Sequence, residues 1–255
     1  MADRYENALI TGATSGMGRG LAAWFARRGT RVYACGRREA ELHSLRDEVS
    51  RAGGRLEAVV MDVSQARETI GRIQEIDRGC GGLDLVVANA GVGLETPAWK
   101  LRWDDLEKLI QVNVLGAAAT LTAALPGMVE RDRGHLVGIS SVAAVRGMPR
   151  MAGYCGSKAF LATFLESLRV DLSRSGVRVS SIHPGYVKTE MTSRNKFKMP
   201  FLVDANEATE RIAKAILREA RQFVFPWQWR PFMGAMHLLP NAAWDAAAGR
   251  RRKKR

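Results

Sequence analysis

Short apolar segments alternate with amphipathic stretches along most of the chain, and this alternation constrains the fold more than any other feature. Segments 83–90 (LDLVVANA) and 135–140 (HLVGIS) are almost continuously apolar, which is typical of parallel strands covered on both faces. Leu42, Leu45 and Val49 instead follow helical spacing. The order of elements predicts right-handed βαβ crossovers and a single α/β domain with a doubly wound sheet. Strands are predicted at 8–11, 32–34, 56–61, 83–88, 136–140, 177–182 and 223–225.

The composition is that of a globular protein, with 46% hydrophobic and 25% charged residues in a chain of 255. Charged residues occur within the first six positions, so no N-terminal targeting signal is evident. No run of about 18 or more uninterrupted apolar residues is present, which argues against a membrane-spanning helix. Cys35, Cys80 and Cys155 lack metal-ligand spacing and are typical of free thiols in a reducing compartment. We therefore expect a cytoplasmic protein without a bound metal.

The charge balance is strongly basic, because 39 Lys and Arg against 26 Asp and Glu give a net charge of +13. The last six residues, RRRKKR, carry six of the positive charges. Basic surfaces attract nucleic acids, anionic membranes and anionic small molecules alike. A nucleic-acid-binding protein would need a recognition motif or stacking aromatic residues beside the charge, and none is evident. Nucleic-acid binding is therefore only a minor alternative to a solvated basic tail.

A glycine-rich turn follows the first predicted strand and precedes a predicted helix. Glycine allows a tight turn and a close approach of the backbone to a phosphate, and the helix N-terminus offers free N–H groups. The spacing is Gly-xxx-Gly-x-Gly, which differs from the G-x-G-x-x-G fingerprint of dinucleotide-binding proteins. A purely structural turn is the alternative, but the strand before and the helix after favour phosphate binding. The residues of this predicted phosphate site are Gly12, Thr14, Ser15, Gly16, Met17 and Gly18.

Tyr154 and Lys158 stand four residues apart in the segment YCGSK, at the predicted start of a helix. Residues at this spacing lie on one face of a helix, so the two side chains can interact. A tyrosine with an unperturbed pKa near ~10 is a poor base at neutral pH. A lysine ammonium one turn away would favour the phenolate and lower the pKa of the tyrosine. Taken alone, the pair is equally consistent with an ordinary helix contact.

Several short motifs occur in a definite order along the chain. They are the TGxxxGxG turn, Asn89-Ala90-Gly91, Asn113, Ser141, Tyr154-xxx-Lys158 and Pro184-Gly185. Over roughly residues 5–225 this series resembles the short-chain dehydrogenase/reductase family. The resemblance implies a Rossmann-type doubly wound sheet of seven parallel strands, with helices on both faces, and a nicotinamide dinucleotide cofactor. It also implies a catalytic domain spanning 1–225, and we expect a separate C-terminal arm at 226–255.

The cofactor is expected to be NADP(H) in preference to NAD(H). Gly36 occupies the strand end where NAD-preferring relatives usually carry an acid, and Arg37 follows it. A guanidinium matches a 2′-phosphate in charge and geometry, although Arg37 and Arg38 could be surface charges at a helix start. The resemblance implies that Asp62 and Val63 bracket the adenine. It further assigns Asn89, Ala90 and Gly91 to the region beside the cofactor.

The resemblance also implies the catalytic residues, which are Asn113, Ser141, Tyr154 and Lys158. Tyr154 would be the general acid/base, and Lys158 would tune it and hold the nicotinamide ribose. Ser141 would bind the substrate oxygen, with the neighbouring Ser140 as its rival. Asn113 would hold a water that relays protons to Lys158, or else serve as a structural amide. The segment HPGYVKTEM matches the family's PGxVxT motif and would orient the carboxamide through Pro184, Gly185, Val187 and Thr189.

The two segments that follow the last motif bear on substrate and partners. A substrate lid is expected at about 189–204, where Arg194, Lys196 and Lys198 interleave with Phe197, Met199, Phe201 and Leu202. That mixture suits an apolar or amphipathic substrate, or a solvated lid with a few core anchors. The C-terminal arm carries aromatic residues and prolines before its basic end. We expect it to pack on the substrate pocket or on a partner subunit, with peripheral contact to a membrane surface as the alternative.

These features predict an NADP(H)-dependent oxidoreductase that interconverts a ketone or aldehyde and an alcohol by hydride transfer. Its partners would be a small-molecule substrate and further copies of the chain, in a homodimer or homotetramer. The alternative from another class is a catalytically silent NADP-binding regulatory or scaffold protein. The presence of Ser141, Tyr154 and Lys158 argues against that alternative, because a silent protein would not need all three.

Overall fold

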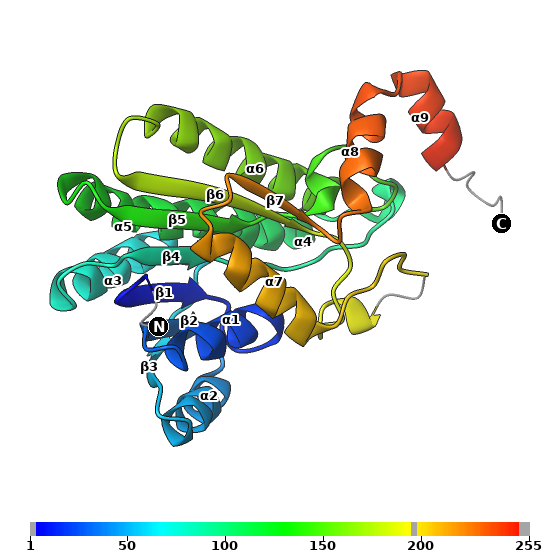
Figure 1. The fold of residues 1–255 in the computed structure, drawn as a ribbon. Helices are drawn as coiled ribbons and strands as arrows, with labels where there is room; N and C mark the ends of the chain where they lie inside the picture. The colour runs from blue at the N-terminus through cyan, green and yellow to red at the C-terminus, as the bar shows by residue number, and fades with distance from the viewer. Residues whose placement is uncertain (1–3, 195–197, 250–255) are drawn as a thin grey trace.

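The chain forms one sheet of seven parallel strands in the order β3-β2-β1-β4-β5-β6-β7 (Figure 1). The strands are β1 (Asn7–Thr11), β2 (Arg31–Gly36), β3 (Arg55–Val60), β4 (Leu85–Ala88), β5 (Gly134–Ile139), β6 (Val177–Pro184) and β7 (Gln222–Phe225). The computed structural model describes residues 4–194 and 198–249. Lys196 and Phe197 of the predicted lid, and the basic tail at 250–255, lie outside the described residues. The predicted doubly wound seven-stranded sheet is confirmed.

Helices cover both faces of the sheet (Figure 1). One face carries α1, α2 and α7, and the other carries α3, α5 and α6, with α4 leading into α5. Strand residues alternate between the two layers, so Leu9 joins one core and Ile10 the other. The bounds are α1 (Gly16–Ala26), α2 (Glu39–Arg51), α3 (Ala66–Gly79), α4 (Trp103–Ile110), α5 (Ala117–Glu130), α6 (Ala152–Asp171) and α7 (Ala205–Leu217).

The predicted strands match the observed ones to within two residues. The strand starts that differ most are those of β4, expected from residue 83 and observed from Leu85, and β5, expected from residue 136 and observed from Gly134. Just before β4, the Asp84 backbone N–H donates to the carbonyl of Asn7 at 2.9 Å, and its carboxylate accepts the backbone N–H groups of Glu6 (2.8 Å) and Asn7 (3.0 Å). The apolar pattern thus places each strand well, and its exact ends less well.

The helical run Trp103–Glu130 is long and apolar enough to cross a membrane by length and composition. It joins α4 and α5 through a π-helical segment, Gln111–Gly116. However, α5 packs on α3 and on strands β4 and β5, and half of its most apolar window is buried within the protein. The run is therefore a core helix of this fold.

Beyond β7 the chain forms two further helices, α8 (Trp229–Leu238) and α9 (Asn241–Ala248). They stand beyond the carboxyl ends of β6 and β7, on the side of the molecule that carries the loops after the strands (Figure 1). The sequence predicted an arm here without specifying its helices. The division of the chain at residue 225 stays a prediction, although β7 does end at Phe225.

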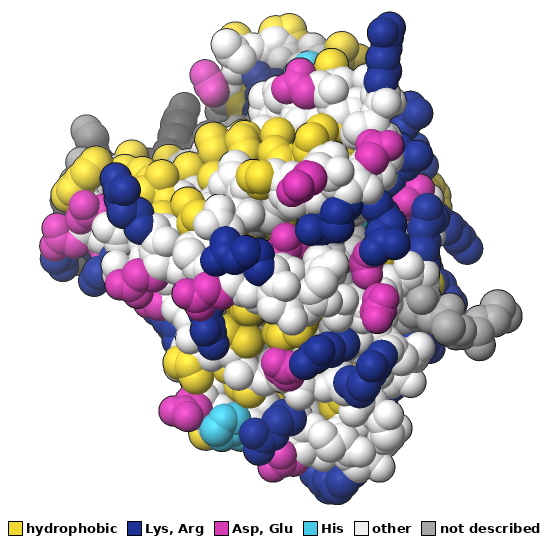
Figure 2. Space-filling model, turned by 90° about the vertical axis from the view of Figure 1, so that its left-hand side faces the viewer, with side chains coloured by type: hydrophobic (Ala, Val, Ile, Leu, Met, Phe, Trp, Pro, Cys, Tyr) yellow, Lys and Arg dark blue, Asp and Glu magenta, His cyan; other side chains and the backbone are white. Residues whose placement is uncertain are grey.

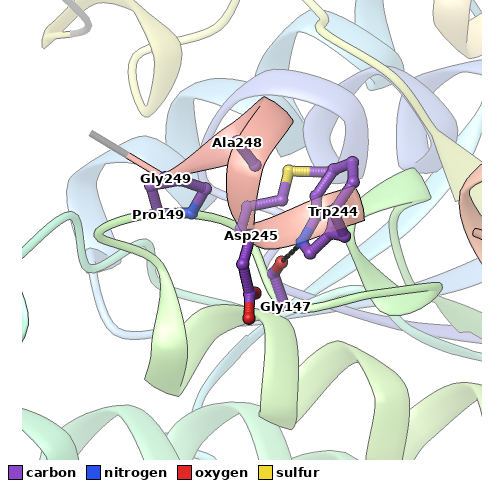
Figure 3. A pocket seen from close by; sticks show the side chains of 7 residues that line it. Gly147, Pro149, Trp244, Asp245, Ala248 and Gly249 are labelled. Atoms are coloured by element: carbon purple, nitrogen blue, oxygen red, sulfur yellow. Dashed lines mark hydrogen bonds between the residues drawn. The ribbon is translucent and has the colours of Figure 1, made fainter. Parts of the chain in front are cut away.

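The loop after β5 holds this arm in place through Arg146. Its guanidinium donates to the backbone carbonyls of Met236 and Leu239, both at 2.6 Å, at the end of α8. The Trp244 indole N–H donates to the carbonyl of Gly147 at 3.0 Å (Figure 3). A cation at a helix C-terminus also interacts favourably with the helix dipole. The arm is therefore fastened to the same loop that begins at the end of β5.

Candidate active site

The sequence motifs meet at one edge of the sheet because all seven strands run in the same direction. The glycine-rich turn follows β1, Asn89 follows β4, Ser141 follows β5, and Gly185 follows β6. Strand order reverses between β1 and β4, and open α/β sheets bind ligands at such switch points. The predicted phosphate site and the predicted catalytic residues therefore share this edge.

The glycines of the first turn are required by close packing and by backbone conformation. Gly12 and Gly16 have positive φ angles, +68° and +54°, which side chains other than glycine rarely adopt. A Cβ on Gly12 would lie 2.8 Å from the Cα of Ala90. A Cβ on Gly18 would collide with the Asn89 amide and with the carbonyl of Gly12. The turn therefore lies directly against the segment after β4.

The beginning of α1 has free backbone donors. Its N-cap residue, Ser15, makes no side-chain hydrogen bond to the helix, and its first turn contains no acidic residue. The uncapped N–H groups and the helix dipole favour an anion at this position. The Thr189 methyl group would lie 3.2 Å from a Cβ on Gly16, so the segment after β6 passes over the same turn.

Asn89 fastens the glycine-rich turn to the end of β4. Its side-chain amide donates to the carbonyls of Thr11 (2.9 Å) and Gly12 (3.3 Å). The Thr11 hydroxyl in return accepts the backbone N–H groups of Asn89 (3.1 Å) and Ala90 (3.2 Å). Each strand end thus supplies a polar side chain to the backbone of the other.

Two arginines after β2 occupy different places around the glycine-rich turn. Arg37, the predicted 2′-phosphate ligand, lies 3.8 Å from the carboxylate of Asp62. Arg38 donates to the Thr14 hydroxyl at 3.2 and 3.3 Å and pairs with Glu190 at 3.3 Å. Arg38 is therefore the arginine that touches the glycine-rich turn, and sequence reasoning had treated it only as a possible surface charge. Both guanidinium groups are exposed.

Ser141 and Ser140 differ in what their hydroxyls contact. The Ser140 hydroxyl is buried and donates to the backbone carbonyl of Lys158 at 2.9 Å. The Ser141 hydroxyl accepts the N–H of Ala143 at 3.1 Å and also interacts with the phenol of Tyr154. Of the two serines, Ser141 is therefore the one whose hydroxyl interacts with Tyr154.

Tyr154 and Lys158 lie on the first two turns of α6, with the Lys158 ammonium 5.9 Å from the centroid of the tyrosine ring. Burial raises the pKa of Tyr154, and its interaction with Ser141 only partly offsets this effect. The predicted lowering by Lys158 was wrong for the chain on its own, because burial penalises the phenolate. Lys158 is itself buried, which lowers its pKa to about 8. Its ammonium donates to the carbonyl of Ile139 at 2.8 Å.

The Asn113 side chain joins the loop after β4 to α6. Its oxygen accepts the backbone N–H of Val92 at 2.8 Å, and its amide donates to the Val92 carbonyl at 2.9 Å. The amide also donates to the hydroxyl of Ser157 at 3.1 Å. Asn113 lies in the π-helical segment, a distortion that is common at functional sites. Its side chain therefore has a clear structural role, and the proton relay stays a prediction.

Gly91 brings the Asn113 and Lys158 side chains together. A Cβ at this position would lie 3.4 Å from the oxygen of Asn113 and 3.5 Å from the ammonium of Lys158. Ser157 adds a further connection, because its hydroxyl donates to the Tyr154 carbonyl at 2.8 Å. Ser157 was missed from the sequence, since nothing in its immediate neighbourhood distinguishes it from an ordinary helix serine.

The segment after β6 is fixed by hydrogen bonds around Thr192. The Thr192 hydroxyl donates to the carbonyl of Val187 at 2.6 Å and accepts the N–H of Thr189 at 2.9 Å. The two ends of the predicted lid meet, because Val187 and Val203 form a parallel bridge. Val187 and Thr189 thereby hold fixed positions beside the glycine-rich turn.

The remaining predicted cofactor residues lie around the same edge. The Asp62 carboxylate accepts the N–H of Ser64 at 3.0 Å, and Val63 is buried against Gly116. Gly185, which follows Pro184, donates its N–H to the carbonyl of Phe225 at 2.8 Å. Met17 packs partly against the core beneath α1. Their roles toward an adenine or a carboxamide stay predictions.

His183 is a residue of this region that the sequence did not single out. It is buried just before Pro184, and its Nδ1 lies 3.2 Å from the backbone carbonyl of Ser141. Its Nε2 lies 2.8 Å from the hydroxyl of Ser181. Burial lowers the pKa of His183, so the neutral ring is favoured. We interpret it as a support for the Ser141 backbone.

The buried Lys158 should give the folded protein a distinct pH dependence. Its pKa is about 8 in the folded chain and 10.5 for an ordinary lysine. Between these values an unfolded lysine binds more protons than Lys158 does, so Lys158 contributes a rise with pH of about 3 kcal/mol to the free energy of unfolding. Lys158→Met should lack this rise, whereas the exposed control Lys214→Met should keep it. Urea unfolding of all three proteins at pH 7.5 and 10.5 measures the effect, and parallel curves for wild type and Lys158→Met would contradict it.

Comparison with known proteins identifies the family. The family model described as short chain dehydrogenase matches residues 6–199, which is more than half of the chain. An uncharacterized oxidoreductase of Myxococcus xanthus is 54% identical over 248 residues, covering 97% of this chain and 98% of the relative.

Solved structures agree in fold. A short chain dehydrogenase/reductase from Burkholderia phymatum, in complex with NAD, has a TM-score of 0.83 at 23% identity and covers 100% of this chain and 99% of its own. A short-chain dehydrogenase from Sphingobium yanoikuyae, in complex with NADPH, has a TM-score of 0.81 at 23% identity, with 98% of both chains covered. Together with the family match, the fold and the site show that this chain is an oxidoreductase of the short-chain dehydrogenase/reductase family.

Proposed function

We propose that the protein is an NADP(H)-dependent oxidoreductase that interconverts a ketone or aldehyde and an alcohol, on an apolar or amphipathic substrate. The observation that carries this proposal is the meeting of Ser141, Tyr154 and Lys158 beside the glycine-rich turn at one edge of the sheet. The same edge holds an uncapped helix N-terminus, which suits a pyrophosphate.

The residues after β2 support NADP(H) over NAD(H). A Cβ on Gly36 would lie 2.6 Å from the methyl group of Thr14, so an acidic side chain does not fit there unless Thr14 moves. Arg37 and Arg38 instead bring two exposed guanidinium groups to this end of the turn. A 2′-phosphate offers these groups a charge-assisted bidentate contact that a 2′-hydroxyl does not.

The two arginines provide a test of cofactor preference. Arg37→Asp and Arg38→Asp should each raise the Kd for NADPH about tenfold or more, because a charge-assisted contact becomes a repulsion. The Kd for NADH should stay within about twofold. Arg46→Asp, on the exposed face of α2, is the matched control and should change neither. Fluorescence titration of both cofactors measures this, and equal losses for NADPH and NADH would contradict NADP(H) preference.

In the proposed mechanism Ser141 and Tyr154 together bind the oxygen of the substrate. The bound nicotinamide dinucleotide supplies or accepts the hydride. In reduction, the Tyr154 O–H bond breaks as its proton passes to the alkoxide oxygen, and the Ser141 hydroxyl donates a hydrogen bond to the same oxygen. The Lys158 ammonium, one turn along α6, stabilises the phenolate that remains. Lys158 would also hold the nicotinamide ribose, and Val187 and Thr189 the carboxamide.

The raised pKa of Tyr154 supports the reductive direction at neutral pH. Burial favours the protonated phenol, which is the form that a proton donor needs. Oxidation of an alcohol would instead need Tyr154 as the phenolate. That form would require a higher pH or a fully charged Lys158 ammonium beside it. Lys158 loses its charge above about pH 8, so its help to the phenolate falls as the pH rises.

Removing the Tyr154 hydroxyl tests the mechanism and the silent-scaffold alternative together. Tyr154→Phe should lower kcat at least about 1000-fold, because proton transfer loses its donor, while the Kd for NADPH changes little. Ser141→Ala should lower kcat strongly, and Ser140→Ala much less, because only Ser141 contacts Tyr154. NADPH consumption with a panel of ketones measures this. Full activity of Tyr154→Phe would refute the mechanism, and an inactive wild type would favour the scaffold.

Exposed apolar residues on the helices of one face support a homodimer. On α6, Phe160 and Val170 are 38% and 59% exposed, and on α5 Val129 is 47% exposed. The rings of Phe160 and Phe164 stack with centroids 5.6 Å apart. Figure 2 shows a band of hydrophobic side chains at the level of α5 and α6. We propose that this helical face pairs with a second copy of the chain, since large apolar patches mark interfaces.

The double substitution Phe160→Asp/Val170→Asp should convert the dimer to a monomer, because it places charges in a buried apolar contact. Val60→Asp, equally exposed but at the far edge strand β3, is the control and should leave the dimer intact. Sedimentation equilibrium of the three proteins measures the mass. A wild type that is monomeric, or a double variant that stays dimeric, would contradict this interface.

Contact of the C-terminal arm with a membrane stays a prediction. The arm exposes Trp227, Phe232, Leu238 and Leu239, and the basic tail that would accompany them lies outside the described residues. Other parts of the arm face the protein itself, because Arg146 and Gly147 bind it to the loop after β5. This packing supports the expectation that the arm borders the substrate site.

A further inference from the structure

Trp229 and Trp227 stand two residues apart at the start of the arm, yet their environments are opposite. Trp229 is 5% exposed, whereas Trp227 is 68% exposed. The indole N–H of Trp229 is buried and has no hydrogen-bond partner among residues 4–194 and 198–249. Burying an N–H without a partner is unfavourable, so the ring contacts around Trp229 must be strong enough to retain it there.

The Trp229 ring lies against the turn that follows β6. A Cβ on Gly185 would collide with its indole nitrogen, so only glycine permits this approach. The ring of Tyr186 meets the indole in an edge-to-face contact with centroids 6.0 Å apart. The first turn of α8 is therefore pressed onto the segment that the family motif assigns to the nicotinamide end of the cofactor.

Trp229 also contacts the end of the predicted lid. The ring of Phe201 lies edge-on to the indole with centroids 6.0 Å apart and an interplanar angle of 87°. Phe201 has φ +55°, a left-handed conformation that is costly for a side chain with a Cβ. Phe232, one turn along α8, makes a further edge-to-face contact at 5.4 Å. We call the four rings Tyr186, Phe201, Trp229 and Phe232 the aromatic wall.

The aromatic wall lies beside the predicted catalytic residues at the end of β6. Trp229 lies against Gly185, and His183, two residues earlier, lies 3.2 Å from the backbone carbonyl of Ser141. Phe201 and Phe232 are 51% and 48% exposed, so their rings have free faces, whereas Trp229 is covered by its neighbours. Trp229 lies between the end of β6 and the lid. It would therefore act on a substrate indirectly, by positioning the rings around it.

We propose that the aromatic wall selects carbonyl compounds with a planar ring-bearing apolar body, and that Trp229 is the positioning residue on which this selectivity depends. The inference rests on the proposed carbonyl–alcohol chemistry and names its substrate class. Ring bodies gain apolar burial and edge-to-face contacts that a short aliphatic ketone cannot make. The four side chains of the wall carry no charge and present mainly ring surface, so they favour an apolar body over an anionic one.

The packing of the arm explains why Trp229 and not Phe201 is the key position. The lid meets the wall through Phe201, near the end where the bridge between Val187 and Val203 fixes its backbone. Trp229 begins α8, and Arg146 holds the other end of that helix through the carbonyl of Met236, so both ends of α8 are fixed. Loss of the indole would leave Phe201 in a costly conformation without its main ring partner. The lid end should then rearrange and the wall should open.

The experiment compares Trp229→Ala with its matched control Trp227→Ala, using 1-tetralone as the ring-bearing probe and 2-butanone as the short one. Wild type should have a kcat/KM for 1-tetralone at least about tenfold higher than for 2-butanone. Trp229→Ala should lose about tenfold or more of kcat/KM for 1-tetralone, mainly through KM, with 2-butanone within about twofold. Trp227→Ala should match wild type, and the Kd for NADPH should be the same in all three.

Trp229→Phe keeps the test decisive if Trp229→Ala does not fold. It retains a ring without the unpartnered N–H, so it should fold and keep the preference for 1-tetralone in part. Equal effects of Trp229→Ala and Trp227→Ala, or a wild type that prefers 2-butanone, would overturn the inference.

Calorimetric titration of 1-tetralone into the NADPH-saturated Tyr154→Phe protein, with and without Trp229→Ala, separates this inference from the proposed function. Binding that Trp229→Ala weakens supports the wall even if no ketone is turned over. Absence of binding in the protein that retains Trp229 overturns it.

Discussion

The common direction of the seven strands is the constraint on which the rest of the structure depends. It places the glycine-rich turn, Asn89, Ser141 and Gly185 at one edge of the sheet. Gly12 of the turn and Gly185 meet there although they lie 173 residues apart in the sequence. Hydrogen bonds between Thr11 and Asn89 then join the ends of the two central strands, β1 and β4, directly. Parallel strands require crossover helices, and these same helices supply Lys158 and the uncapped N-terminus of α1.

The strands and the order of motifs could be predicted from the sequence because both depend on local patterns. Near-continuous apolar runs identify central strands, and glycines at fixed spacing identify a turn with positive φ. Strand ends and hydrogen-bond partners depend on residues far away in sequence. The Asp84 carboxylate bonds the start of β1 from just before β4, and the Ser140 hydroxyl bonds the backbone of α6. No local pattern carries that information.

The charges of the site were the least predictable part. The spacing of Tyr154 and Lys158 predicts that they interact, but the sign of the effect on the tyrosine depends on how deeply both are buried. Burial opposes charge on either group, so the isolated chain favours a neutral phenol and weakens the lysine cation. The folded protein therefore carries a lysine whose desolvation lowers stability at neutral pH. Retaining such a residue is understandable only where its charge serves the site.

The site separates into a part that the fold determines and a part that the chain beyond β7 determines. Strand ends hold Ser141 and, with α6, Tyr154 and Lys158, and in the proposed mechanism these groups would carry the proton transfer. The arm adds Trp229 against Gly185, and Arg146 fastens it to the loop that begins at Ser141. A change in the arm can therefore alter which body fits beside the reacting oxygen without altering the chemistry at that oxygen. A shared fold leaves substrate choice open for this reason, and under the proposal made above the deciding contacts would lie on a helix outside the sheet.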